Sequence, residues 1–99
     1  MIGESSLMFT SQSVPRRKPG ILVSQVDGSL VLLDAKGGNY FALDEVGCRI
    51  WELSDGSKSI EEVAQALADE YAAPTDEIEA DIIELLSEMA NENLVEQVG

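Results

Sequence analysis

The spacing of hydrophobic residues changes near residue 44, from short strand-like runs to the three-to-four spacing of amphipathic helices. Three apolar runs come first, at residues 21–26, 30–33 and 40–43. Asp27-Gly28 between the first two is the signature of a tight hairpin turn, and a second set of turn-forming residues precedes the third run. The pattern predicts a three-stranded antiparallel meander. We expect the third strand at the sheet edge, where backbone donors and acceptors stay unpaired.

Three helices are predicted after the strands. Asp44 is placed to cap the first helix, which we expect to end near Ser54. Its apolar positions are Val46, Ile50 and Leu53, with Trp51 on the flank. Ser59 and Glu62 form a capping box for the second helix. Its expected buried residues are Ile60, Val63, Ala64, Leu67 and Tyr71. Thr75 is the predicted cap of the third helix, which ends at residues 91–93. Residues 94–98 form either a short strand or a loosely packed end.

The third helix is more apolar than a small core requires. One narrow stripe is enough to dock it, and that stripe comprises Ile78, Ile82, Leu85 and Met89. Ile83, Leu86 and Ala90 widen the apolar arc on one flank. This flank either packs inside the protein or forms one wall of a groove beside residues 40–43. An edge strand next to an apolar groove can bind an extended peptide, which adds a strand and places alternate side chains in the groove.

Residues 1–20 show no hydrophobic periodicity and are interpreted as a flexible N-terminal tail, followed by one domain over residues 21–99. The tail ends in a basic cluster of Arg16, Arg17 and Lys18. We interpret the cluster as a solvated arm, although contact with an acidic partner is the alternative.

Composition narrows the range of functions. The 99 residues carry a net charge of −13, and those after Gly20 include 18 acidic and 3 basic side chains. Such a surface repels nucleic acid and anionic lipid, so neither is an expected partner. No apolar run is long enough to span a bilayer, and a signal peptide is not apparent. With a single cysteine the chain fits a reducing compartment, and we expect it in the cytoplasm.

Catalysis and metal binding are not expected. The sequence has no histidine, so Cys48 lacks the usual base, and a small buried cysteine is the simpler interpretation. One cysteine cannot build a thiolate zinc site. We therefore predict no enzyme activity, no metal and no cofactor.

An ordered set of short motifs resembles the PqqD-like family, also called RiPP recognition elements, over about residues 21–95. The matching strand and turn positions are Asp27-Gly28, Val31-Leu32-Leu33-Asp34 and Gly38-Asn39-Tyr40-Phe41-Ala42-Leu43-Asp44. The matching positions in the second half of the chain are Val46-Gly47, Ile50-Trp51, Asp55-Gly56, Ile60-Glu61-Glu62, Leu67, Tyr71, Ala80-Asp81, Leu85-Leu86 and Leu94-Val95. The Tyr40-Phe41 pair and the spacing from Gly47 to Trp51 look most like stand-alone members of lasso-peptide pathways. Asp44 departs from their frequent Asn, but either residue caps a helix.

The resemblance implies an α+β, winged-helix-like fold with three strands followed by three helices. It also implies binding of the leader segment of a ribosomally made precursor peptide, which would be presented to a cysteine-protease-like leader peptidase and to a macrolactam-forming synthetase. The implied contact residues are Asn39, Tyr40, Phe41, Ala42 and Leu43 on the third strand, with Ile82, Ile83, Leu86 and Ala90 on the third helix.

Two other functions stay open from sequence. A peptide chaperone of the pyrroloquinoline quinone pathway, or of another radical-SAM pathway, would share the fold but bind a different peptide. An acidic winged-helix protein-interaction module is the second alternative. A DNA-binding winged helix is disfavoured, because the third helix carries six carboxylates and no Lys or Arg to contact phosphates.

Overall fold

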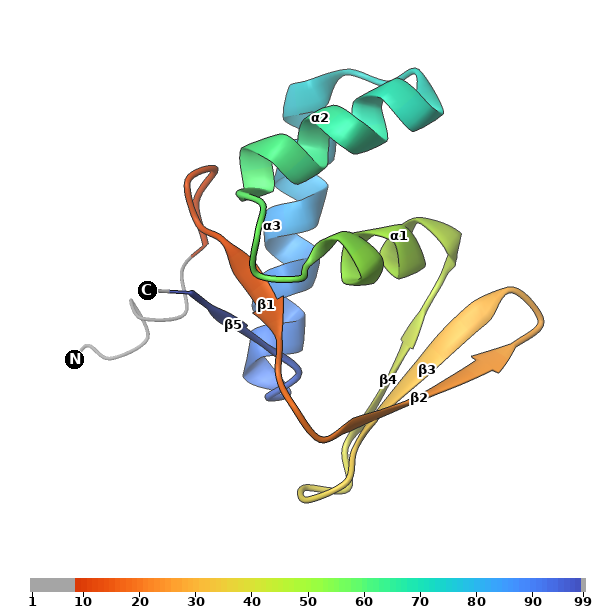
Figure 1. Cartoon of the computed structure of the whole chain (residues 1–99). Helices are drawn as coiled ribbons and strands as arrows, with labels where there is room; N and C mark the ends of the chain where they lie inside the picture. Colours follow the sequence, from red (N-terminus) through yellow and green to blue (C-terminus); the bar gives the residue numbers. More distant parts are fainter. Residues whose placement is uncertain (1–8, 99) are drawn as a thin grey trace.

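A computed structural model describes residues 9–98 as two small sheets and three helices (Figure 1). The main sheet is antiparallel with the strand order β2-β3-β4, formed by β2 (Ile21–Val26), β3 (Ser29–Asp34) and β4 (Tyr40–Leu43). Asp27 and Gly28 both have positive φ in the turn between β2 and β3. The predicted meander and the edge position of its third strand are confirmed.

The helices are α1 (Glu45–Leu53), α2 (Ile60–Tyr71) and α3 (Thr75–Asn91). Asp44 caps α1 as predicted, because its Oδ1 accepts a hydrogen bond from the Gly47 amide at 2.8 Å. The capping box of Ser59 and Glu62 at the start of α2 is also present. The α+β fold class is therefore confirmed. No helix in residues 9–98 combines the length and the apolar character that crossing a membrane requires.

Thr75 does not cap α3, so that prediction is wrong. The cap position is Pro74, whose φ of −62° and ψ of 134° hold the backbone extended before the helix, and no side chain there caps the helix. The Pro74 carbonyl already accepts from the Ile78 amide at 3.2 Å. Thr75 is thus the first residue inside the helix, with its own backbone in helical conformation.

The core lies where the inner face of the main sheet meets the helices. Its members share nearly complete burial: Phe9, Leu32, Leu43, Ile50, Trp51, Ile60, Val63, Ala64, Leu67, Ile82, Leu86, Met89, Leu94 and Val95. Three helical predictions need correction. Val46 and Tyr71 are 42% and 38% exposed, whereas Trp51 is buried rather than on the flank. The α1 face turned to the core is therefore Gly47, Ile50 and Trp51.

Residues 9–20 are not a flexible tail, which corrects that interpretation. Strand β1 (Pro15–Arg17) pairs with β5 (Val95–Gln97) in an antiparallel two-stranded sheet, so the chain end predicted as a possible strand is one. Phe9 is buried in the core. The partners are some 80 residues apart, and local sequence gives no sign of such a pairing. Residues 1–8 of the predicted tail lie outside the described part.

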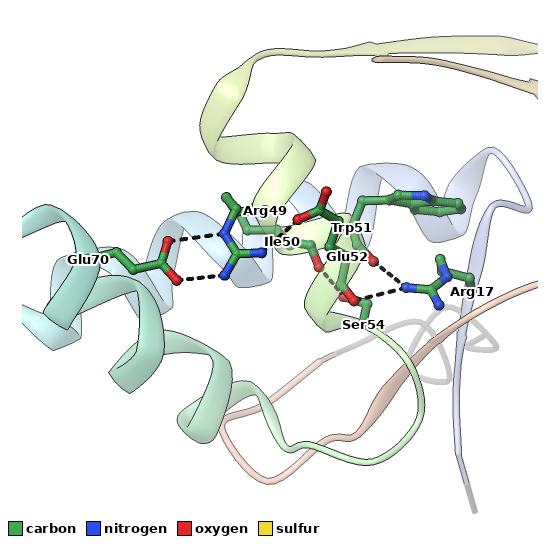
Figure 2. Close-up of polar contacts among 7 residues, drawn as sticks. All are labelled: Arg17, Arg49, Ile50, Trp51, Glu52, Ser54 and Glu70. Atoms are coloured by element: carbon green, nitrogen blue, oxygen red, sulfur yellow. Dashed lines mark hydrogen bonds and ion pairs between the residues drawn. The ribbon is translucent and has the colours of Figure 1, made fainter. Parts of the chain in front are cut away.

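The basic cluster has a structural role that the sequence did not suggest. Arg17 donates from one guanidinium nitrogen to the carbonyls of Trp51 and Glu52, at 2.8 and 3.0 Å, and the guanidinium lies 5.7 Å from the Trp51 ring centre (Figure 2). These carbonyls belong to the last turn of α1, which has no basic residue of its own. Arg17 therefore supplies the positive charge and the donors that a helix C-terminus lacks.

Arg49 joins α1 to α2. Its guanidinium donates to both carboxylate oxygens of Glu70, at 3.0 and 2.6 Å, and to Glu52 at 2.6 Å (Figure 2). The hydrogen bonds from Arg49 lower the pKa of Glu70, and those to Glu70 and Glu52 raise the pKa of Arg49. The pairs are solvent-exposed, so they orient the two helices more than they stabilise them.

Replacing Arg17 by alanine is expected to cost about 2 kcal/mol of unfolding free energy, because two charge-assisted hydrogen bonds and the contact with Trp51 are lost. Arg16→Ala is the matched control. It removes an exposed ion pair with Glu96, for which about 0.5 kcal/mol is typical, together with a side-chain stem that lies beside Gly56. Urea unfolding, followed by the fluorescence of Trp51, the only tryptophan, measures the unfolding free energy of both variants. Equal losses for the two variants would contradict the capping role.

Candidate peptide-binding groove

Strand β4 presents free backbone groups at its outer edge. The Asp34 amide donates to the Asn39 carbonyl at 2.9 Å, immediately before the ladder between β3 and β4. Hydrogen-bonded and non-hydrogen-bonded pairs alternate along an antiparallel ladder. Phe41 and Leu43 therefore point their backbone groups toward β3, whereas Tyr40 and Ala42 point theirs away from the sheet. Another extended chain can pair with these two residues.

The side chains of β4 alternate between the two faces of the sheet. Tyr40 is 71% exposed, and Ala42 is exposed on the same face. Phe41 packs against the core and Leu43 belongs to it. Adjacent residues of a strand face opposite ways, so Phe41 faces the core and Tyr40 faces outward. Asn39, just before the strand, is exposed.

A groove of about 330 Å³ lies between β4 and α3. Its wall on the strand side is formed by residues 41–44 together with Gly47, and Leu85 and Glu88 line the helix side. Gly47 keeps this region close-packed, because a Cβ atom there would lie 3.1 Å from Leu43 Cδ2 and 3.2 Å from Asp44 Oδ1. The predicted groove beside the third strand is present, next to the free edge of that strand.

The face of α3 that turns to this groove differs from the predicted one. Ile82 and Leu86 are completely buried in the core, so they offer no surface to a peptide. Ile83 and Ala90 are half-buried and do not line this groove; Ala90 lines another depression, with Phe9 and Lys18. Leu85, which the sequence placed in the core stripe, lines the groove instead.

Rotation of the helix by part of a turn explains the difference. The buried positions Ile82, Leu86 and Met89 define the centre of the core-facing stripe. Leu85 then lies on one side of it, toward β4, and Ile83 lies on the other side. The apolar arc of α3 is wide enough for the helix to bury an apolar stripe in either orientation. Hydrophobic periodicity alone therefore did not fix the orientation of the helix. The signal that could have found Leu85 is its position one turn from Asp81 and Glu88, on the polar border of the arc.

The groove is apolar at its base and acidic at its rim. Phe41, Leu43 and Leu85 provide the apolar surface, and Asp44 and Glu88 stand at the border. Asp44 is held in place by its cap bond to the Gly47 amide. No lysine or arginine is among the lining residues. This surface suits an extended segment with apolar side chains and without negative charge.

Sequence comparison places the chain in a known family. A family model described as Coenzyme PQQ synthesis protein D (PqqD) matches residues 29–95, about two-thirds of the chain. The chain belongs to the PqqD family. The matched region runs from the start of β3 into β5 and therefore includes both walls of the groove. The predicted resemblance is confirmed.

Two solved structures share the fold of this chain. A lasso peptide synthetase B1 complexed with the leader peptide is 30% identical, with a TM-score of 0.73, and the alignment covers 83% of this chain and 96% of that one. The PqqD truncation of Methylobacterium extorquens PqqCD, described as a functional and stand-alone RiPP recognition element, is 29% identical. Its TM-score is 0.79, and the alignment covers 94% of this chain and 98% of that one.

Curated relatives match over a shorter span. The "PqqA binding protein" of Xanthomonas campestris pv. campestris (strain B100) is 38% identical over 53 residues, which is 54% of this chain and 58% of that protein. The chain thus spans little more than half the length of this relative.

Cys48 lies in α1 at the border of the core in this PqqD-family chain. It is half-buried against the core, and its Sγ lies 3.8 Å from the carbonyl oxygen of Leu43. Its neighbour Arg49 is engaged with Glu70 and Glu52. Within residues 9–98, no group of three or more His, Cys, Asp or Glu side chains is arranged to hold a metal ion.

Proposed function

We propose that this protein binds the leader segment of a ribosomally synthesised precursor peptide, most directly of a lasso peptide, and presents it to processing enzymes. The observation that carries the proposal is the open edge of β4 beside the groove lined by Leu85. The leader would pair with Tyr40 and Ala42 as an additional strand. Its alternate side chains would enter the space between Phe41, Leu43 and Leu85.

Backbone pairing and side-chain recognition have different roles in this arrangement. Strand addition supplies affinity but does not depend on sequence, because every peptide has the same backbone groups. The apolar groove supplies selectivity. The acidic rim of Asp44 and Glu88 disfavours leaders with carboxylates at the neighbouring positions.

The relatives support a leader peptide as the ligand. The lasso peptide synthetase B1 named above was solved with its leader peptide, and that protein aligns over most of this chain. A second candidate ligand is a PqqA-type peptide of the quinone pathway, which is favoured by the 38% identity to the Xanthomonas PqqA binding protein. The two ligands would occupy the same groove.

The protein itself would make and break no covalent bonds in this role. Its partners would be a separate leader peptidase of the cysteine-protease type and a macrolactam-forming synthetase, with the bound leader bringing the precursor to each. We expect this to take place in the cytoplasm, where the precursor is made.

Titration tests the proposal. The labelled leader of the precursor encoded nearest to this gene, its scrambled version and a PqqA-type peptide are titrated with the protein, and fluorescence anisotropy is recorded. We expect saturable binding of the true leader with a Kd near or below about 1 μM, roughly −8 to −9 kcal/mol. Preference for the PqqA-type peptide would assign the second ligand. If neither peptide binds at protein concentrations up to about 100 μM, the binding free energy is weaker than about −5.5 kcal/mol. That result would contradict leader binding.

Leu85→Gln should weaken leader binding about tenfold or more, because a polar amide replaces apolar surface in the groove. Ile83→Gln is the matched control, with the same new side chain at a half-buried position of the same helix that does not line this groove. The anisotropy titration compares the two variants. A larger loss for Ile83→Gln would assign peptide binding to the opposite flank of α3, as the sequence predicted.

A further inference from the structure

β2 is the second open edge of the main sheet, at the opposite end from β4. Five of its six residues are exposed. Val26 and Ser29 are direct partners across the two-residue turn, and such a closing pair is hydrogen-bonded. Because bonded and non-bonded pairs alternate, the backbone groups of Ile21, Val23 and Gln25 point away from β3. These three residues form an unsatisfied outer edge.

β2 lacks the charged residues and the proline that protect many edge strands. Its sequence Ile-Leu-Val-Ser-Gln-Val contains no charged residue and no proline. The edges of the smaller sheet differ, because β1 contains Pro15 and two arginines, and β5 contains Glu96. β4 is also unprotected, but α3 lies beside it and completes a groove. No such groove is completed along β2, and at its turn end Gln25 and Gly28 border a depression that α1 and α2 share, opposite Arg49 and Glu70.

Charge determines which partner fits this edge. Residues 21–33 carry a single charge, on Asp27, in a chain whose net charge is −13. β2 itself offers a basic partner no carboxylate, and in the depression beside Gln25 the carboxylates of Glu52 and Glu70 are already paired with Arg49. A second copy of the chain meets an uncharged edge identical to its own. The carboxylates of the two copies lie mainly on their helices, and salt screens charges beyond about 8 Å at physiological ionic strength.

We propose that β2 pairs with β2 of a second copy of this chain, antiparallel and across a two-fold axis at Val23. In this register Val23 faces Val23 of the second copy, and Ile21 faces Gln25. All three residues with outward backbone groups then exchange hydrogen bonds, about six in total. Val23 is 51% exposed in one copy, and the new cross-strand pair covers it. The two sheets join into one continuous sheet of six strands.

The dimer keeps both peptide grooves open. In the joined sheet the strand order runs from β4 of one copy through the paired β2 strands to β4 of the other, so each β4 edge lies at an outer end. Pairing through one short strand makes a small interface, and we expect a dimer dissociation constant on the order of 100 μM. The dimer therefore forms at high protein concentration without competing with a peptide.

Sedimentation equilibrium of the full chain from about 5 to 500 μM tests the dimer. We expect the average mass to rise from 10.7 kDa toward twice that value. Val23→Lys places two lysines together at the axis and should hold the mass at 10.7 kDa throughout. Gln25→Lys, at an exposed position, should do the same. Val46→Lys, an exposed valine of α1 changed in the same way, should associate like the unmodified chain.

Two results would overturn the proposal. A mass of 10.7 kDa at every concentration would mean that β2 does not pair with itself, and that its edge serves a different partner or none. Association that persists in both lysine variants of β2, with their Trp51 fluorescence showing a folded protein, would place the contact elsewhere on the molecule.

Discussion

Leu86→Glu is expected to leave the protein largely unfolded. Leu86 has no exposed surface and packs in the core with Ile82 and Met89. Removing a buried leucine typically costs 2–5 kcal/mol, and burying an unpaired carboxylate adds to this loss. The free energy of unfolding of a small domain is about 5–10 kcal/mol in total, so little stability would be left. Urea unfolding followed by Trp51 fluorescence provides the measurement.

Leu85→Glu is the control for this prediction. The new carboxylate has the same size and charge, one residue away, but Leu85 is only half-buried and borders the solvent-open groove. We expect a cooperative unfolding transition with a loss of less than about 2 kcal/mol. A folded Leu86→Glu variant that has lost peptide binding would show that Leu86, and not Leu85, faces the ligand.

Ala42→Pro is expected to weaken leader binding by about 10- to 100-fold while the protein stays folded. The Ala42 amide points away from β3, so proline removes a donor from the peptide-facing edge without breaking the existing ladder. An unmade backbone hydrogen bond in a buried interface costs about 1–3 kcal/mol, which corresponds to this range. Anisotropy titration with the leader provides the measurement.

Ala42→Val is the matched control, because it keeps the amide hydrogen and favours a strand. It should bind the leader within about threefold of the unmodified protein. Full binding by the Ala42→Pro variant would contradict strand addition at β4, and equal losses in both variants would indicate a steric effect of the side chain instead.

Local sequence signals predicted those parts of the fold that local interactions determine. The Asp27-Gly28 turn, the Asp44 cap and the capping box of Ser59 and Glu62 each depend on residues within a few positions, and all three are present. The edge position of β4 followed from the simple order of the strands. The general place of the groove could therefore be predicted.

Features that depend on distant contacts could not be predicted in the same way. The pairing of β1 with β5 joins the two ends of the chain, and the capping of α1 by Arg17 depends on that pairing. The orientation of α3 is set by which side chains the sheet and the other helices cover. Since Leu85 and Leu86 are both apolar, hydrophobic periodicity alone could not decide which of them faces the groove.

Hydrogen exchange of individual backbone amides, measured by NMR with and without the leader peptide, is the decisive test of leader capture at β4. We expect the amides of Tyr40 and Ala42, which point away from the sheet in the free protein, to become protected when the leader binds. The amides of Val23 and Gln25 on the opposite edge should not respond to the leader. Binding that leaves Tyr40 and Ala42 unprotected, or that protects β2 instead, would contradict capture of the peptide at β4.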